Sequence, residues 1–141
     1  MFSDMTQVLK SLRGFDALPE VALDQIAAYT SVRVVRAGET VFCQGEPSPY
    51  CFGVLSGEVM MQHVSQDGRF PPKVLGVIGS GGLFGESSLF EDKLRAAMAT
   101  VSKDGKLVVI RGSELRNWMQ RNPETARSFL SVFLNALPPL P

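Results

Sequence analysis

The chain has 141 residues, of which 45% are hydrophobic, and its 14 lysines and arginines balance its 14 aspartates and glutamates. A domain of this size can bury a core without metals or disulfides, and the balanced charge argues against both intrinsic disorder and a strongly basic nucleic-acid-binding surface. No run approaches the roughly 20 apolar residues that span a bilayer, and the N-terminus lacks the basic and apolar regions of a secretory signal, so we expect a cytoplasmic protein with no membrane partner.

Two short helices are expected at the start of the chain. Apolar Val8, Leu9 and Leu12 recur at helical spacing between residues 6 and 12. Pro19 then suits the first turn of a second amphipathic helix, because an N–H group at that position would have no helical partner. The strand-rich part of the chain is expected to begin at Ser31.

The middle of the chain alternates short β-rich runs with turn signals that contain glycine, proline or aspartate. Seven or eight short strands with close turns favour a small barrel or jelly roll, because full pairing leaves few exposed edges. We therefore expect an α+β fold, an eight-stranded antiparallel β jelly-roll barrel flanked by short N-terminal helices and by C-terminal helices. The predicted runs are 32–35, 41–43, 51–55, 59–64, 74–78, 97–101 and 107–110.

Two helices are expected after the strands. Ser113 is a candidate N-cap for a helix over residues 114–120. The Asn-Pro-Glu run at 122–124 combines a cap, a first-turn proline and an acid that matches the helix dipole, so a last helix is predicted to run to about Ala136. The prolines that follow must end it. We predict one domain over residues 1–136 and a proline-rich tail or linker stub over 137–141.

The sequence does not contain the residue patterns that a catalytic site or a metal site needs. Cys43 and Cys51 match no zinc or redox spacing, and each is expected to be a buried free thiol. His63 is the only histidine, whereas a metal-dependent enzyme on a similar barrel needs two or three. Ser87 and Ser88 have no histidine nearby to activate them. We expect no enzyme activity and no metal site.

One stretch of the sequence suits an anion. Gly85 allows a close approach of the backbone, and residues 86–90 are expected to form a short helical turn. The first N–H groups of such a turn, on Glu86, Ser87 and Ser88, have no helical partners and can bind an anion. Arg95 could add a guanidinium that grips two oxygens of a phosphate in one plane. Together these residues predict a phosphate cradle.

Glu86 narrows the choice of ligand. A carboxylate beside a phosphate repels it unless hydrogen-bond donors such as ribose hydroxyls occupy its oxygens. A cyclic nucleotide presents one monoanionic phosphate next to one free hydroxyl and would satisfy both Glu86 and Arg95. The residues alone leave a second interpretation open, in which Glu86 only stabilises the start of the turn and Arg95 is its partner in a surface ion pair.

The surrounding residues resemble the cyclic-nucleotide-binding domain of catabolite activator proteins, protein kinase A regulatory subunits and cyclic-nucleotide-gated channels. Phe84-Gly85-Glu86-Ser87-Ser88-Leu89, followed by Arg95-Ala96-Ala97, is similar to the phosphate-binding cassette of that family. Residues 37–46 and 52–59 resemble its glycine-punctuated second to fourth strands. The likeness covers nearly the whole chain.

The resemblance implies roles for individual residues. Glu86 would bind the ribose 2′-hydroxyl and Arg95 the phosphate. Because Ala96 offers no side-chain donor or acceptor after the arginine, the resemblance favours cAMP as the ligand, with cGMP as the second candidate. The remaining implied contacts are the backbone amides of Gly85, Ser87, Ser88 and Ala96, and the pocket-lining side chains of Met61 and Leu75.

The resemblance also implies a regulatory sensor domain. Nucleotide binding would move the cassette together with the last helix, and this motion would signal to a regulated effector domain or protein. No residues follow the prolines to form a DNA reader, so we expect no nucleic-acid partner. The competing hypothesis is a ligand-free interaction or scaffolding module of the same fold, in which Arg95 pairs internally.

Overall fold

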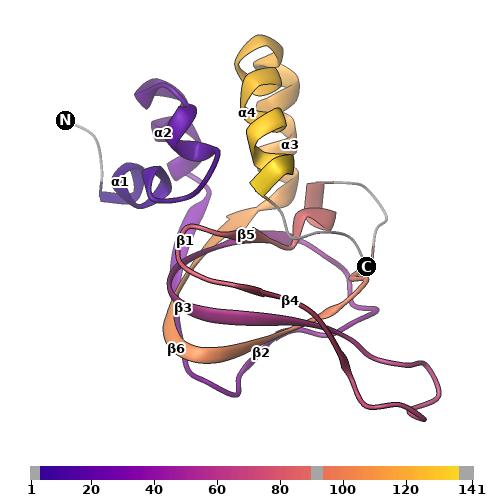
Figure 1. Ribbon diagram of the computed structural model, residues 1–141. Helices are drawn as coiled ribbons and strands as arrows, with labels where there is room; N and C mark the ends of the chain where they lie inside the picture. Colours follow the sequence, from indigo (N-terminus) through magenta and orange to yellow (C-terminus); the bar gives the residue numbers. More distant parts are fainter. Residues whose placement is uncertain (1–3, 90–93, 137–141) are drawn as a thin grey trace.

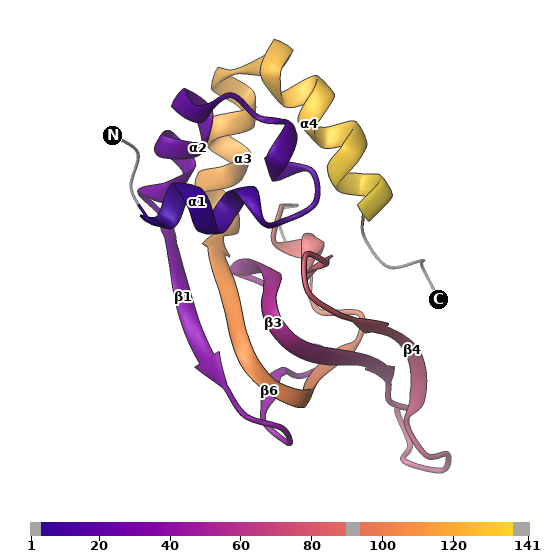
Figure 2. The ribbon, with the colours of Figure 1, turned by 60° about the vertical axis from the view of Figure 1, so that its left-hand side comes forward.

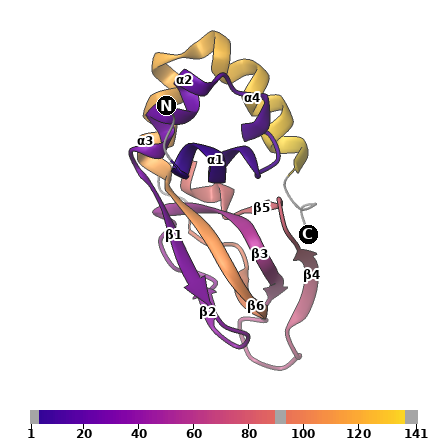
Figure 3. The same cartoon turned by 90° about the vertical axis from the view of Figure 1, so that its left-hand side faces the viewer.

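The computed structural model describes residues 4–89 and 94–136 (Figure 1). The helices lie together at one end of a curved antiparallel sheet, as Figure 2 and Figure 3 show from two further sides. In chain order the elements are α1 (Asp4–Lys10), η1 (Phe15–Ala17), α2 (Glu20–Ala27), β1 (Thr30–Val35), β2 (Thr40–Phe42), β3 (Tyr50–His63), β4 (Lys73–Ile78), β5 (Leu83–Phe84), η2 (Glu86–Leu89), β6 (Met98–Arg111), α3 (Gly112–Arg121) and α4 (Pro123–Ala136).

The helices lie close to where the sequence predicts them, although α1 and α3 each begin two residues before the predicted range. α4 begins at Pro123 and extends to Ala136, as predicted, whereas Pro19 is the N-cap of α2 and not a residue of its first turn. Ser113, by contrast, is not an N-cap, since α3 begins at Gly112 and its N-cap is Arg111. The N–H group of Gly112 donates to the carbonyl of Pro49 at 2.9 Å, which gives the helix start a backbone partner in place of a capping side chain. Residues 137–141, predicted as a tail, lie outside the described residues.

The described sheet has six strands, so the prediction of an eight-stranded closed barrel is wrong. The strands follow the path β1-β6-β3-β4, with β2 also paired to β6 and β5 also paired to β3, and this path does not close. The predicted runs 51–55 and 59–64 form one strand, β3, and the C-terminal runs 97–101 and 107–110 fall almost entirely within β6. Both long strands curve along their length (Figure 2).

A bulge explains why the apparent turn at Gly57 does not end β3. The pairing between β3 and β6 shifts register between Val54 and Val59, while the strand itself continues. Gly57 has a φ of 88°, and a Cβ atom there would lie 2.6 Å from the carbonyl oxygens of Lys103 and Asp104. Glycine therefore bends the strand within the sheet, as a bulge does, whereas the sequence pattern alone resembles a hairpin turn.

Two apolar cores lie on opposite sides of the sheet. On β6, Val108 and Ile110 pack against the helices, whereas Leu107 belongs to the second core. In the first core the ring of Phe129 meets that of Phe15 edge-on at 4.9 Å, which joins α4 to the N-terminal segment. The second core includes Val35, Phe42, Phe52, Val54, Val59, Met61, Ile78, Phe84, Ala99 and Leu107.

The two cysteines differ in exposure. Cys51 is a buried free thiol, as predicted, because it faces the helical core. Cys43 is also free but exposed, so that part of the prediction is wrong. The preceding residue, Phe42, points into the second core, and the alternation of side chains then turns Cys43 outward. Within residues 4–89 and 94–136, no helix combines the length and the apolar character that crossing a bilayer requires.

Candidate functional site

Arg95 lies inside the protein. Its side chain is 3% exposed, and its Nη1 donates to the carbonyl of Gly85 at 2.9 Å. Its Nη2 donates to the carbonyl of Tyr50. The guanidinium carbon lies 4.0 Å from the centroid of the Phe42 ring and 5.7 Å from that of Phe52, within the range of cation–π attraction. This burial excludes the interpretation of Arg95 as a member of a surface ion pair.

The main chain of Arg95 is held separately from its side chain. The N–H group of Arg95 donates to the carbonyl of Glu46, and the N–H group of Gly45 donates to the carbonyl of Arg95, both at 2.8 Å. An isolated β-bridge between Pro47 and Leu94 continues this pairing. The turn after β2 therefore fixes where the arginine leaves the backbone.

Gly85 fits a position that a side chain would block. It has a φ of 78°, and a Cβ atom would lie 2.9 Å from Cδ2 of Phe52 and 3.0 Å from Nη1 of Arg95. The predicted helical turn follows at once as η2, which is described from Glu86 to Leu89, while Phe90 lies outside the described residues. The glycine thus lets the chain pass close to the arginine and enter the turn.

The residues after Gly85 are placed differently from one another. Glu86 is partly exposed, and its carboxylate is close enough to act electrostatically on Arg95. Ser88 is buried, and its amide donates to the carbonyl of Gly85 at 3.4 Å, so this donor takes part in the turn itself. Ala96 is exposed immediately after the buried arginine. The backbone of Ser87 lies within η2 between Glu86 and Ser88.

Burial governs the charges at this site. Desolvation lowers the pKa of Arg95 to about 10, while Cys51, Glu86 and Glu46 act in the opposite direction. The guanidinium therefore stays cationic at neutral pH although it is removed from water. Burial also raises the pKa of the Cys51 thiol to about 12, so this neighbour is neutral at the same pH. The site is a buried cation with a partly exposed carboxylate beside it.

Met61 and Leu75 are part of, or pack against, the apolar core that contains the aromatic residues around Arg95. Met61 pairs with Gly76 across β3 and β4, and Leu75 lies at the register shift beside this pair. Met61 belongs to the same core as Phe42 and Phe52, and Leu75 packs against that core. The structure thus brings the predicted apolar lining and the predicted phosphate-binding residue to one apolar core.

The sequence analysis did not identify three residues that contact the guanidinium of Arg95. Phe42, Phe52 and the carbonyl of Tyr50 form the binding site of the guanidinium within the protein. Both phenylalanines fall in the glycine-punctuated blocks, so the blocks contained a signal for them. The Tyr50 carbonyl had no such signal, because any residue supplies a backbone oxygen.

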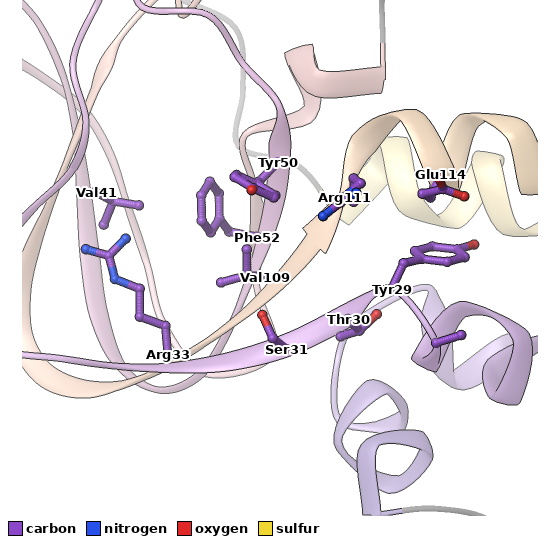
Figure 4. A pocket seen from close by; sticks show the side chains of 11 residues that line it. Tyr29, Thr30, Ser31, Arg33, Val41, Tyr50, Phe52, Val109, Arg111 and Glu114 are labelled. Carbon is purple, nitrogen blue, oxygen red and sulfur yellow. The ribbon is translucent and has the colours of Figure 1, made fainter.

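A cavity of about 850 Å³ lies next to this site (Figure 4). Phe52 and Tyr50 contribute to its wall, so the cavity and Arg95 share these two neighbours. Among the described residues that line the cavity, none belongs to the predicted nucleotide site. The lining consists of Ala28, Tyr29, Thr30, Ser31, Arg33, Val41, Tyr50, Phe52, Val109, Arg111 and Glu114.

Comparison with known proteins identifies the family. The family model of the cyclic nucleotide-binding domain matches residues 32–122. A CRP-like cAMP-activated global transcriptional regulator of Mycobacterium tuberculosis is 32% identical over 100 residues, which are 71% of this chain and 44% of the regulator. This chain therefore matches less than half the length of that relative.

Two solved structures share the fold over most of their length. The N-terminal domain of a transcriptional regulator from Streptomyces coelicolor A3(2) has a TM-score of 0.71 and 30% identity, covering 91% of this chain and 90% of that one. The sensor domain of the transcriptional regulator DNR from Pseudomonas aeruginosa has a TM-score of 0.77 and 25% identity, covering 92% and 86%. The chain belongs to the cyclic nucleotide-binding domain family.

Proposed function

We propose that this chain is a regulatory domain that binds a cyclic nucleotide, with Arg95 on the phosphate and Glu86 on the ribose. The observation that carries the proposal is the buried guanidinium of Arg95, which lies beside the partly exposed Glu86 and the turn that starts at Gly85. A cation removed from water gains from an anionic partner, because charge-assisted hydrogen bonds contribute roughly 1.5–3 kcal/mol each.

The remaining predicted contacts agree with this ligand. Met61 and Leu75 offer an apolar surface to the base or the sugar, and the backbone amides of Gly85, Ser87 and Ala96 are candidate donors to the phosphate. In this proposal Ser88 contributes through the turn, because its amide already donates to Gly85. Arg95 would turn from its backbone partners toward the phosphate when the nucleotide binds.

We propose cAMP as the preferred nucleotide and cGMP as the weaker one. Ala96 follows the arginine and has no hydroxyl that could meet guanine. The mycobacterial relative is described as cAMP-activated, which supports the same choice.

The terminal helices are the proposed output. A Cβ atom on Gly112, the first residue of α3, would lie 2.4 Å from the carbonyl oxygen of Ser88, so η2 and α3 are in close contact. A shift of the turn on ligand binding would therefore act directly on α3 and then on α4, and so on an effector domain or partner protein. In this proposal the domain itself is not an enzyme, acts in the cytoplasm and binds no nucleic acid.

Calorimetric titration of the purified chain with cAMP and cGMP tests the proposal. We expect saturable heat with cAMP, weaker binding of cGMP, and loss of at least about ten-fold in affinity in Glu86→Gln and in Arg95→Gln. Arg69→Gln is the matched control, because Arg69 is an exposed arginine in a surface ion pair with Asp67. Absence of binding for both nucleotides at about 100 μM would overturn the assignment.

One observation favours the second candidate function, a ligand-free interaction module. The carbonyls of Gly85 and Tyr50 accept hydrogen bonds from the guanidinium of Arg95 without any ligand. In such a module the terminal helices would bind a partner whether or not nucleotide is present. A titration without heat, combined with a folded protein, selects this candidate.

A further inference from the structure

We infer that the cavity beside Phe52 is a second ligand site, separate from the proposed nucleotide site, and that it takes an elongated organic dianion with an apolar body. The cavity of about 850 Å³ falls within the range of 300–1,000 Å³ that is typical of small-molecule sites. No predicted cassette residue is among the described residues that line it, so the inference does not depend on nucleotide binding.

The floor of the cavity is apolar. Val41 from β2, Phe52 from β3 and Val109 from β6 present their side chains to it (Figure 4). Val41 and Val109 are only partly buried, although both pack against the second core. A ligand with an apolar middle would cover these side chains and remove them from water, which stabilises the complex in proportion to the apolar surface that is buried.

Two arginines stand at opposite ends of this floor. In Figure 4 the guanidinium of Arg33 lies near Val41, and Arg111 lies on the far side of Phe52 and Val109. Arg33 pairs with Leu107 between β1 and β6, and Arg111 is four residues further along β6. Four residues of a strand span roughly 13 Å, so one small anion cannot contact both side chains at their bases.

The charges of the lining favour an anion. Of the described residues that line the cavity, Arg33 and Arg111 are cationic and Glu114 is anionic, which leaves a net positive charge. Arg33 also meets Glu39 at 3.7 Å, in a pair whose two side chains are 44% and 40% exposed. Such an exposed pair contributes little, so a ligand carboxylate can compete for this arginine.

A hydroxyl group of the wall completes the match. Thr30 and Ser31 line the cavity between the two arginines; the Thr30 hydroxyl donates to the carbonyl of Ile26 at 2.8 Å, whereas the Ser31 hydroxyl is directed toward the interior of the cavity in Figure 4. A few convergent polar groups around an apolar floor fix the orientation of a ligand rather than supply most of its affinity. The chemistry of the whole surface therefore fits two acidic groups joined by an apolar chain or ring.

Backbone-amide NMR with ¹⁵N-labelled protein tests the inference with defined probes. We expect octanedioate to shift the signals of residues 30–33 and 109–111 in a saturable manner. Butanedioate, which is four carbons shorter, and octanoate, which has one acidic group, should each bind about ten-fold more weakly or worse.

Three variants test whether octanedioate binds at the two arginines of the cavity. Arg33→Gln and Arg111→Gln change exposed residues and should fold normally, and each should weaken octanedioate about ten-fold, to the level of octanoate. Arg69→Gln should leave it unchanged. The inference is overturned if octanedioate causes no saturable shift at about 10 mM, if its shifts map elsewhere, or if neither arginine variant weakens it.

Nucleotide binding serves as an independent readout. The variants Arg33→Gln and Arg111→Gln should keep any cyclic-nucleotide affinity of the unmodified chain, since neither residue belongs to the proposed nucleotide site. Glu86→Gln should keep the affinity for octanedioate. Failure of the dianion site and failure of the nucleotide site are therefore distinguishable in the same set of proteins.

Discussion

The carbonyl of Gly85 accepts a hydrogen bond of 2.9 Å from Nη1 of Arg95, which closes the two ends of the predicted cassette onto each other. The same glycine leaves only 3.0 Å between that nitrogen and the position where a Cβ atom would be. Arg95 is thus hydrogen-bonded to the backbone at the start of the cassette, while the neighbouring Glu86 acts on it electrostatically.

Gly85→Ala should destabilise the protein through two effects. A left-handed φ of 78° costs an alanine about 1 kcal/mol, and the crowding against Phe52 and Arg95 adds to this cost. Gly38→Ala is the matched control, because Gly38 has a φ of 95° but has no atom within 4 Å of its Cβ position. Urea denaturation should show a larger loss of stability for Gly85→Ala. Equal losses would mean that contacts at Gly85 are unimportant.

Arg95→Gln should lower the free energy of unfolding by about 1–3 kcal/mol, because the carbonyls of Gly85 and Tyr50 lose charged donors. The favoured sequence interpretation treated this residue as a ligand contact, whereas its burial gives it a structural role as well. Thermal and urea unfolding measure the effect. Arg69→Gln should change stability by less than about 0.5 kcal/mol, and a similar small value for Arg95→Gln would contradict the role assigned to its hydrogen bonds.

Phe129→Ala should cost about 3–5 kcal/mol, because the ring is fully buried and meets both Phe15 and Trp118 edge-on. The neighbouring Leu130 is 37% exposed, so Leu130→Ala should cost clearly less. Chemical denaturation of the two variants compares them. A small effect of Phe129→Ala would show that α4 is not fixed to the rest of the helical core.

Cys51 should make the protein less stable in alkaline solution. Burial raises the pKa of its thiol from about 9 to about 12, so between these values the folded state holds a proton that the unfolded state has lost. Stability is then fully present below pH 9 and falls by up to about 1.4 kcal/mol for each pH unit above it.

The comparison of Cys43→Ser with the double variant Cys43→Ser/Cys51→Ala isolates this contribution. Urea denaturation at several pH values between 8 and 10.5, chosen to bracket the ordinary pKa of a thiol, should show the stability difference between them shifting in favour of the double variant as pH rises. A difference that does not depend on pH would show that Cys51 titrates normally in the folded protein.

Much of the architecture could be predicted because it follows local patterns. The helix that starts at Pro123 was predicted from a cap, a proline and an acid that act within one turn. Gly57 contributed to the error in the strand count because it is compatible with both a turn and a bulge, and the choice depends on β6, which lies more than 40 residues away. Non-local pairing of this kind leaves no periodic signal in a single sequence.

The sequence predicted which residues make up the candidate site but not that Arg95 is buried. The motif indicated which residue is the cation, but the burial of Arg95 depends on Phe42, Phe52 and the backbone of Tyr50, which come from other strands. The cavity lined by Arg33 and Arg111 was not predicted, since these residues are about 80 positions apart in the sequence and come to one surface only through the pairing of β1 with β6.

The carbonyl of Tyr50 has a wider effect than its single hydrogen bond suggests. Tyr50 pairs with Arg111, the residue that leads into α3, at the first rung of β3. Any ligand that draws the Arg95 guanidinium away must first compete with this oxygen, and it leaves the oxygen without its charged donor at the foot of the helix. The Tyr50 carbonyl and an anionic ligand therefore compete for the guanidinium of Arg95. Because the lost hydrogen bond lies one residue pair from α3, part of the free-energy cost of binding a ligand arises at the junction between β6 and α3.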